Sequence, residues 1–196
     1  MKLLHFFEKR GKIRRIRKER MCHMKELNRI NTVCFTGHRI IGADFDEKAF
    51  KMAIDVALRN GFDTFICGGA LGFDTYAAEE IIKLKKSHPE IELHLYLPCK
   101  DQEARWSERD KEKYYEILKC ADHVDCPDTP YYDGCMRARN YKMVDNSSLC
   151  ISYLKDNVKS GTAQTVRYAC QSGLFLCNLS ASKDSCFFEI KEKYFR

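Results

Sequence analysis

Short apolar runs alternate along this chain with longer segments whose apolar residues recur at helical spacing. The apolar runs cover residues 32–36, 64–67, 92–97, 123–125, 149–154 and 174–178. The segments of helical period cover residues 44–60, 73–87, 108–120, 133–145 and 162–172. Strands that alternate with helices of this length form βαβ units. Several runs are apolar throughout, as expected when helices cover both faces of a sheet. The pattern therefore predicts an α/β three-layer sandwich with a mainly parallel sheet of about six strands.

The length of the chain limits how many domains this pattern can build. With 196 residues it is long enough for one domain with a substantial core and short for two. We expect residues 31–178 to form a single Rossmann-like nucleotide-binding domain. Residues 1–30 are then an N-terminal extension, helical or disordered. Residues 179–196 are a C-terminal tail or an edge element, with 186–190 as a strand or a short helix.

Charge is concentrated in the extension. The whole chain carries a net charge of +6, but residues 1–30 contain 11 lysines and arginines against three glutamates. The rest of the chain is therefore close to neutral. A cationic tail can bind nucleic acid or an anionic surface. The alternatives are a solvated extension, or translation that starts at Met21 or Met24.

The apolar runs and the first residues of the chain indicate where the protein is located. No apolar run approaches the roughly 20 residues of a membrane helix, and the start lacks the features of a signal peptide. We therefore expect a cytoplasmic protein with no membrane partner.

The 11 cysteines include no CxxC pair, and the cluster of Cys120, Cys126 and Cys135 around His123 has no familiar zinc spacing. Loop and core cysteines are the preferred interpretation, and we expect neither a metal site nor a required cofactor.

Candidate binding residues follow the strands, because ligands of open parallel sheets bind at the carboxyl ends of the strands. The first predicted strand leads into Thr36, Gly37, His38 and Arg39. Gly37 permits a sharp turn or a close approach of the backbone to a ligand. His38 and Arg39 supply donors, and the planar guanidinium matches two phosphate oxygens.

A glycine-rich loop follows the second predicted strand and opens a helix. It contains Gly68, Gly69, Ala70 and Gly72, and Asp74 lies in the first helical turn. Backbone amides of such a loop, together with the positive end of the helix, favour an anion. Asp74 either favours the helix start through the dipole, or accepts hydrogen bonds from a sugar, or positions a water molecule.

Two further segments belong to the same predicted edge. Ser160, Gly161 and Thr162 open the last helix and form a second glycine-bearing helix start. Arg139 and Asn140 lie within a predicted helix, where asparagine has no propensity advantage. If that helix borders the crevice, both side chains can reach a ligand. Trp106, the single tryptophan, either stacks on a base or packs in the core, and core packing is the default.

In this order and spacing, these motifs resemble the YpsA-like proteins of the SLOG superfamily. The resemblance rests on Thr36–Arg39, the GGALGFD stretch at 68–74, Arg139–Asn140 and Ser160–Thr162, and it covers roughly residues 31–178. The superfamily includes the DNA-processing protein DprA and the Lonely Guy phosphoribohydrolases. The resemblance implies a Rossmann-like fold and a nucleotide-derived ligand, such as an ADP-ribose or NAD derivative, held by the glycine loops.

Three functions are compatible with these residues. The first is binding, or sensing, of the nucleotide derivative. The second is N-glycoside hydrolysis, with Asp74 and His38 as the catalytic candidates. Lonely Guy enzymes use a glutamate of a PGGxGTxxE motif, and Gln164 or Thr165 stands near its place here, which favours binding over cleavage. The third is DprA-like nucleic-acid binding, which the near-neutral body disfavours. A homo-oligomer is compatible with all three.

Overall fold

The computed structural model describes residues 28–155 and 159–180, and it contains the six strands and five helices that the alternating pattern predicts. The strands are β1 (Thr32–Gly37), β2 (Thr64–Cys67), β3 (Glu92–Tyr96), β4 (His123–Asp125), β5 (Leu149–Tyr153) and β6 (Phe175–Asn178). The helices are α2 (Glu47–Arg59), α3 (Phe73–Leu84), α4 (Glu108–Cys120), α5 (Cys135–Asp145) and α6 (Gly161–Gln171). A short 3-10 helix, η2 (Arg29–Asn31), precedes β1.

The six strands form one sheet in the order β4-β3-β2-β1-β5-β6. Every pair of neighbours is parallel, so the expected Rossmann-like α/β fold is confirmed. From β1 the chain first builds outward through β2, β3 and β4, and then returns to the other side of β1 with β5 and β6. The order of strands therefore reverses between β1 and β5. In open sheets this switch point is where a ligand crevice forms.

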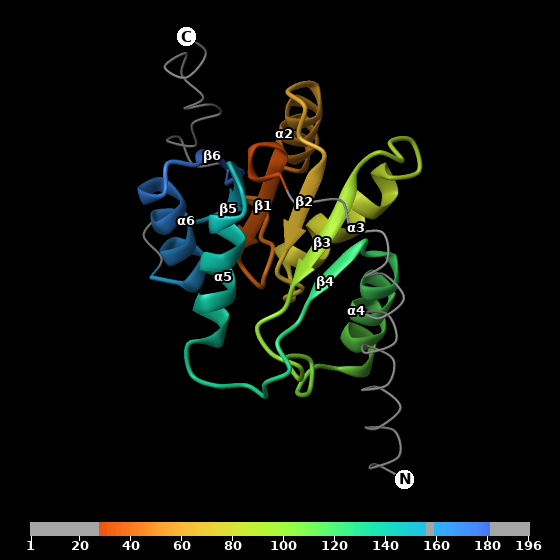
Figure 1. The fold of residues 1–196 in the computed structure, drawn as a ribbon, viewed down its shortest axis with the longest axis vertical. Coiled ribbons are helices and arrows are strands. Elements are labelled where there is room, and N and C mark those ends of the chain that lie inside the picture. The colour runs from red at the N-terminus through yellow and green to blue at the C-terminus, as the bar shows by residue number, and fades with distance from the viewer. Residues whose placement is uncertain (1–27, 156–158, 181–196) are drawn as a thin grey trace.

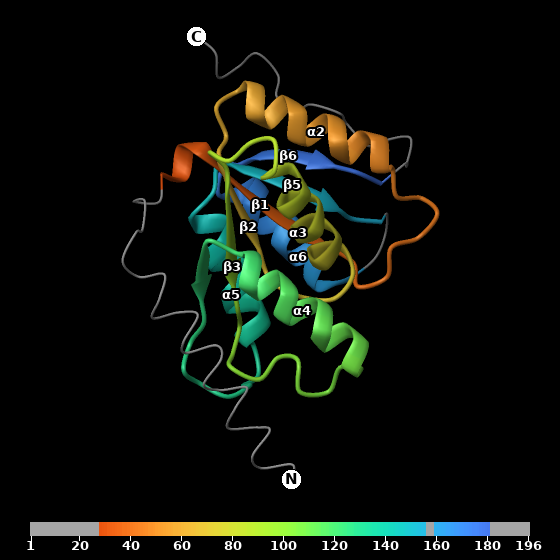
Figure 2. The ribbon, with the colours of Figure 1, turned by 90° about the vertical axis from the view of Figure 1, so that its right-hand side faces the viewer.

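Helices cover both faces of the sheet and complete the three layers. Figure 2 shows α2, α3 and α4 on the face toward the viewer, with α5 and α6 behind the sheet. Residues of β1 alternate between the two cores: Val33 and Phe35 pack with α2 and α3, and Cys34 packs with α5 and α6. All three are at most 1% exposed. A fully buried side chain of this kind contributes about 1.5–3 kcal/mol to folding.

Helix boundaries differ from the sequence pattern by a few residues, for local reasons. Helix α2 begins at Glu47 because the carboxylate of Asp46 accepts the Ala49 amide as an N-cap. Helix α5 begins at Cys135 because Gly134 adopts a left-handed conformation (φ 88°), which ends the preceding loop. Apolar periodicity locates a helix but does not mark the residue at which the backbone leaves helical geometry.

The two predicted terminal segments lie largely outside the described residues. This applies to residues 1–27 of the basic extension and to the expected edge element at 186–190. Leu179 and Ser180, the last described residues, lie beside the start of α2, where the Asp46 amide donates to the Leu179 carbonyl over 3.3 Å. β6, which Leu179 and Ser180 directly follow, is the edge strand at the left of the sheet in Figure 1. Among the helices of the described ranges, none is long and apolar enough to span a membrane.

Candidate functional site

A pocket of about 310 Å³ opens at the carboxyl ends of the strands, at the switch point between β1 and β5. It joins residues from four segments that are far apart in the chain: the end of β1, the glycine loop, α5 and the start of α6. Eleven of the predicted binding residues line it: Thr36, Gly37, His38, Arg39, Ala70, Asp74, Arg139, Asn140, Ser160, Gly161 and Thr162. Tertiary structure thus assembles in one place what the sequence offered as separate motifs.

The start of α6 forms one wall of the pocket. Ser160 is its N-cap, and the Ser160 hydroxyl accepts the Ala163 amide over 3.1 Å. Gly161 is the first helical residue, and a side chain there would meet no atom within 4 Å. No acidic residue occupies the first turn of α6. The positive end of this helix therefore faces the pocket with no carboxylate in its own first turn.

The loop after β1 supplies two different side chains. Arg39 is exposed at the pocket, whereas His38 is half-buried. Nε2 of His38 accepts a hydrogen bond of 3.1 Å from the Lys155 backbone amide, and its ring packs edge-on against Tyr153. Burial and the charge of Lys155 lower the pKa of His38, while Asp44 opposes this shift. The neutral imidazole is therefore favoured, and Arg39 is the cationic group that remains open to a ligand.

Asp74 and Arg139 form a buried ion pair at the base of the pocket. Oδ2 of Asp74 lies 3.7 Å from Nη1 of Arg139, and the two side chains are 9% and 7% exposed. The guanidinium also donates to the Gly68 carbonyl and, over 3.4 Å, to the Tyr96 carbonyl. Asp74 accepts the Ala70 amide over 3.4 Å. This pair connects the glycine loop, β3, α3 and α5, which gives both residues a structural role beside any contact with a ligand.

Burial also sets the ionisation of this pair. Desolvation raises the pKa of Asp74, and the charge of Arg139 and the amides of Ala70 and Gly68 partly offset that rise. Desolvation likewise lowers the pKa of Arg139, opposed by Asp74. Among the described residues that line the pocket, Asp74 is the only carboxylate.

Three predicted glycines support the pocket without lining it. A Cβ at Gly68 would overlap the guanidinium of Arg139 and lie 2.6 Å from Oδ2 of Asp74. Gly72 has φ +83°, and a Cβ there would overlap the backbone of Arg39. Gly69 also has positive φ, and its carbonyl accepts the side chain of Gln102 over 3.0 Å. These glycines permit close packing of the loops around the pocket.

Asn140 connects the two helices that border the pocket. Its Nδ2 donates to Oγ1 of Thr165 over 2.9 Å, and this hydroxyl donates to the Gly161 carbonyl over 2.8 Å. Asn140 therefore holds the first turn of α6 against α5. This role explains why an asparagine lies inside a helix, where helix propensity does not favour it.

Sequence reasoning missed a polar cluster beside His38. The Tyr153 hydroxyl donates to Asp44 over 2.7 Å and accepts the Gly42 amide over 3.0 Å. Nζ of Lys155 lies 3.4 Å from Asp44. The hydrogen bond from Tyr153 and the charge of Lys155 lower the pKa of Asp44. No motif identifies the cluster, because its members come from one loop and one strand more than 100 residues apart.

Trp106 and several of the described cysteines pack in the interior, whereas Cys120 and Cys170 are exposed. Trp106 packs edge-on against Tyr114, with 5.3 Å between ring centroids, and contacts the main core. Of the thiols placed in apolar runs, Cys34, Cys67, Cys150 and Cys177 are all buried. Across residues 28–155 and 159–180, no group of three or more metal-ligating side chains is placed to hold an ion.

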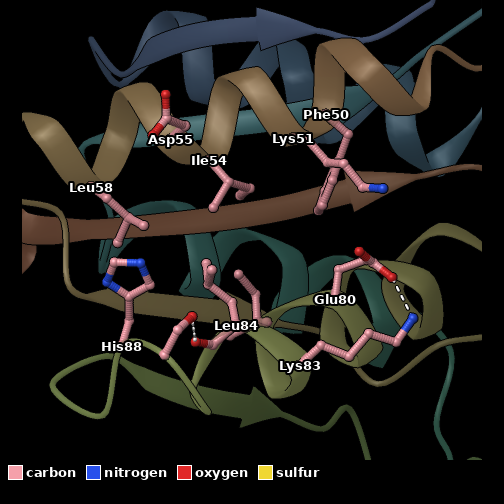
Figure 3. Close-up of a pocket in the computed structure, with 11 residues that line it drawn as sticks. Phe50, Lys51, Ile54, Asp55, Leu58, Glu80, Lys83, Leu84 and His88 are labelled. Atoms are coloured by element: carbon pink, nitrogen blue, oxygen red, sulfur yellow. Dashed lines mark hydrogen bonds and ion pairs between the residues drawn. The ribbon is translucent and has the colours of Figure 1, made fainter.

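A second cavity, of about 350 Å³, lies between α2 and α3 (Figure 3). Phe50, Ile54 and Leu58 point into it from α2, and Leu84 approaches from α3. Its charged groups include Lys83 and Glu80, which pair with each other. None of the predicted binding residues lies there. Its apolar lining lacks the uncompensated donors of the switch-point pocket, so we assign the candidate site to the latter.

Comparison with known proteins agrees with this fold. The model of the YspA SLOG family matches residues 41–173. A UPF0398 protein of Halalkalibacterium halodurans is 36% identical over 122 residues, which are 61% of this chain and 65% of that protein. The matched part thus spans about two thirds of that relative's length. A UPF0398 protein of Bacillus thuringiensis strain Al Hakam is 26% identical over 127 residues, covering 64% of this chain and 68% of its own.

Two solved structures share the fold at low sequence identity. DNA processing protein A from Helicobacter pylori, described with its single-stranded DNA binding mode, superimposes with a TM-score of 0.55 and 20% identity, covering 79% of this chain and 67% of its own. DprA from Streptococcus pneumoniae gives a TM-score of 0.50 and 17% identity, covering 75% and 49%. Because the family model matches more than half of the residues of this chain, the chain belongs to the YspA SLOG family.

Proposed function

We propose that this protein binds a nucleotide-derived ligand through its phosphate at the switch-point pocket, with ADP-ribose or NAD derivatives as the candidate class. One observation carries the proposal. The positive end of α6, which has no acidic residue in its first turn, and the exposed guanidinium of Arg39 converge on one pocket of about 310 Å³. Backbone amides at a helix start and a planar guanidinium are both strong phosphate donors.

The surroundings of Asp74 favour binding over cleavage. General acid–base catalysis needs a carboxyl or imidazole group free to exchange a proton with the substrate. Asp74 is already engaged by Arg139 and by the Ala70 amide, and Nε2 of His38 by the Lys155 amide. We therefore infer a sensor or binding module rather than an N-glycoside hydrolase.

The test compares ligands that differ only in the phosphate. AMP, ADP-ribose and NAD are titrated into the full chain by calorimetry, beside adenosine as the phosphate-free control. We expect AMP or ADP-ribose to bind and adenosine to bind at least tenfold more weakly. Ligand at about 100 times its Kd adds about 2.7 kcal/mol of stability, which a thermal melt detects.

Variants then locate the site. Arg39→Ala removes the open cation and is expected to weaken AMP binding about tenfold or more, since a charge-assisted hydrogen bond contributes roughly 1.5–3 kcal/mol. Arg59→Ala, an exposed arginine on α2, is the matched control and leaves affinity unchanged. Equal binding of AMP by the Arg39→Ala variant and the parent protein would overturn the site. Ligand recovered in cleaved form would establish a hydrolase instead.

Single-stranded DNA is a second candidate, favoured by the shared fold with a protein described as binding it. A phosphate of the strand would then occupy the same pocket. Fluorescence anisotropy with a labelled oligonucleotide tests this. Binding that weakens in Arg39→Ala but survives removal of residues 1–23 would support it, because the basic extension alone produces salt-dependent binding. Binding that disappears with the extension would contradict it.

A further inference from the structure

Three of the exposed large apolar side chains lie on loops that follow the strands, two of them adjacent to each other. Five large apolar residues are exposed within the part of the chain that the structure describes: Ile30, Ile40, Met52, Tyr131 and Tyr132. Tyr131 and Tyr132, which are 60% and 50% exposed, follow one another on the loop between β4 and α5. Ile40 directly follows Arg39. Single exposed apolar residues are common, but adjacent aromatic rings on a ligand-binding edge are a functional signal.

The loop that carries the two tyrosines is held by hydrogen bonds. The Tyr131 amide donates to the carboxylate of Asp101 over 2.9 Å, and the Lys100 amide donates to the Thr129 carbonyl over 3.1 Å. The Tyr132 carbonyl accepts the Cys135 amide over 3.2 Å at the start of α5. Exposure of these rings is therefore a property of an anchored loop. Such anchoring lowers the entropic cost of binding a planar partner.

The same loop leads directly into the pocket wall. Cys135 is the first residue of α5, and Met136, four residues after Tyr132, lines the pocket together with Arg139 and Asn140. The tyrosines therefore stand at the α5 rim of the site. A ligand whose phosphate sits at the start of α6 and whose sugar lies against α5 would extend toward this rim.

The size of the pocket is compatible with such an extension. About 310 Å³ is at the lower end of the range for small-molecule sites, which runs from about 300 to 1,000 Å³. The lining is polar around Thr36, Ser160 and Thr162 and suits a sugar phosphate. In the proposed pose, an aromatic base attached to that sugar lies toward the two tyrosines.

We propose that Tyr131 and Tyr132 form a stacking surface for the nucleobase of the ligand whose phosphate the switch-point pocket holds. This inference rests on the proposed function and extends it to the base. Stacking accepts any base, because every base presents a π-face, so the surface selects base-bearing ligands over bare sugar phosphates.

The experiment separates the two halves of the ligand. AMP and ribose 5-phosphate are titrated into the parent protein and into Tyr131→Ala, Tyr132→Ala and the double variant. We expect the parent to prefer AMP, and the double variant to lose about 5- to 100-fold in AMP affinity while its affinity for ribose 5-phosphate stays unchanged. Tyr132→Phe keeps the ring and should retain affinity. Met52→Ala, which removes another exposed side chain, is the control.

The outcomes distinguish this inference from the proposed function. Equal affinity of the parent for AMP and ribose 5-phosphate, or full AMP affinity in the double variant, would overturn the stacking surface and leave the phosphate site standing. An equal loss of both ligands in the double variant would show a general disturbance of the site and would also overturn it. Failure of the parent to bind either ligand would overturn the phosphate site and the stacking surface together.

Discussion

Nε2 of His38 accepts the backbone amide of Lys155 over 3.1 Å, across the point where the strand order reverses. One residue follows β1 and the other follows β5, so this bond joins the two loops that border the pocket. The side chain of Lys155 continues the connection to Asp44, 3.4 Å away. The β1 and β5 sides of the site are thereby held together by a titratable group.

The first prediction concerns pH. Burial and Lys155 lower the pKa of His38 below its ordinary value of 6.5. Below pH 6.5 the unfolded chain takes up this proton before the folded one does. The stability that neutral His38 contributes is therefore complete above pH 6.5 and is lost as the pH falls toward the lower pKa of the folded state. We expect the free energy of unfolding to fall correspondingly between pH 7 and pH 5.

The variant His38→Gln isolates this contribution. An amide oxygen can still accept the Lys155 amide, but it does not titrate in this range. Urea unfolding at several pH values measures the free energy of unfolding of both proteins. As the pH falls from 7 to 5, the parent should lose more of this free energy than the variant. A constant gap across that range would contradict the assignment to His38.

The second prediction concerns the buried pair. Arg139→Ala leaves Asp74 without its partner and also removes donors to the Gly68 and Tyr96 carbonyls. Removing one member of a buried pair costs about 3–5 kcal/mol. The exposed pair of Arg59 with Asp55 is the control, and Arg59→Ala should cost less than about 1 kcal/mol. Urea unfolding measures both, and similar losses in the two variants would refute the structural role of Arg139.

The third prediction compares two glycines. Gly68→Ala places a methyl group against Arg139 and Asp74, so we expect a loss of about 1–3 kcal/mol from overpacking. Gly161→Ala meets no atom within 4 Å and should leave stability within about 0.5 kcal/mol of the parent. The methyl group added at Gly161 lies at the pocket and should weaken AMP binding. Thermal melts and AMP titrations of both variants test this, and a strongly destabilised Gly161→Ala would contradict it.

The fourth prediction concerns the connection between α5 and α6. Asn140→Ala removes the 2.9 Å hydrogen bond to Thr165 and leaves a buried hydroxyl with one partner fewer. We expect a loss of about 0.5–1.5 kcal/mol in unfolding free energy. AMP affinity should also fall, because the first turn of α6 is no longer held against α5. Gln164→Ala, on the exposed side of α6, serves as the control. If the Asn140→Ala variant bound AMP as tightly as the parent, the hydrogen bond between Asn140 and Thr165 would not support the binding site.

The sequence by itself determined the elements of this protein, because local periodicity reflects which side of each segment is buried. It also identified eleven of the residues that line the pocket, since residues such as Gly37, Arg39 and Gly161 stand where strands end or a helix begins. The sequence could not show which of these residues face a ligand and which make room for neighbouring side chains. Gly161 borders open space, whereas Gly68 makes room for Arg139, and the two look alike in a glycine-bearing loop.

Only the tertiary structure decided which charges remain available. Arg39 and Arg139 are both arginines near predicted ligand-binding segments, yet Asp74 neutralises Arg139 while Arg39 stays exposed. The Tyr153–Asp44–Lys155 cluster and the Tyr131–Tyr132 rim likewise depend on contacts between distant segments. The physical reason is that periodicity records burial along one segment, whereas pairing, desolvation and the shape of a pocket depend on how segments are placed against one another.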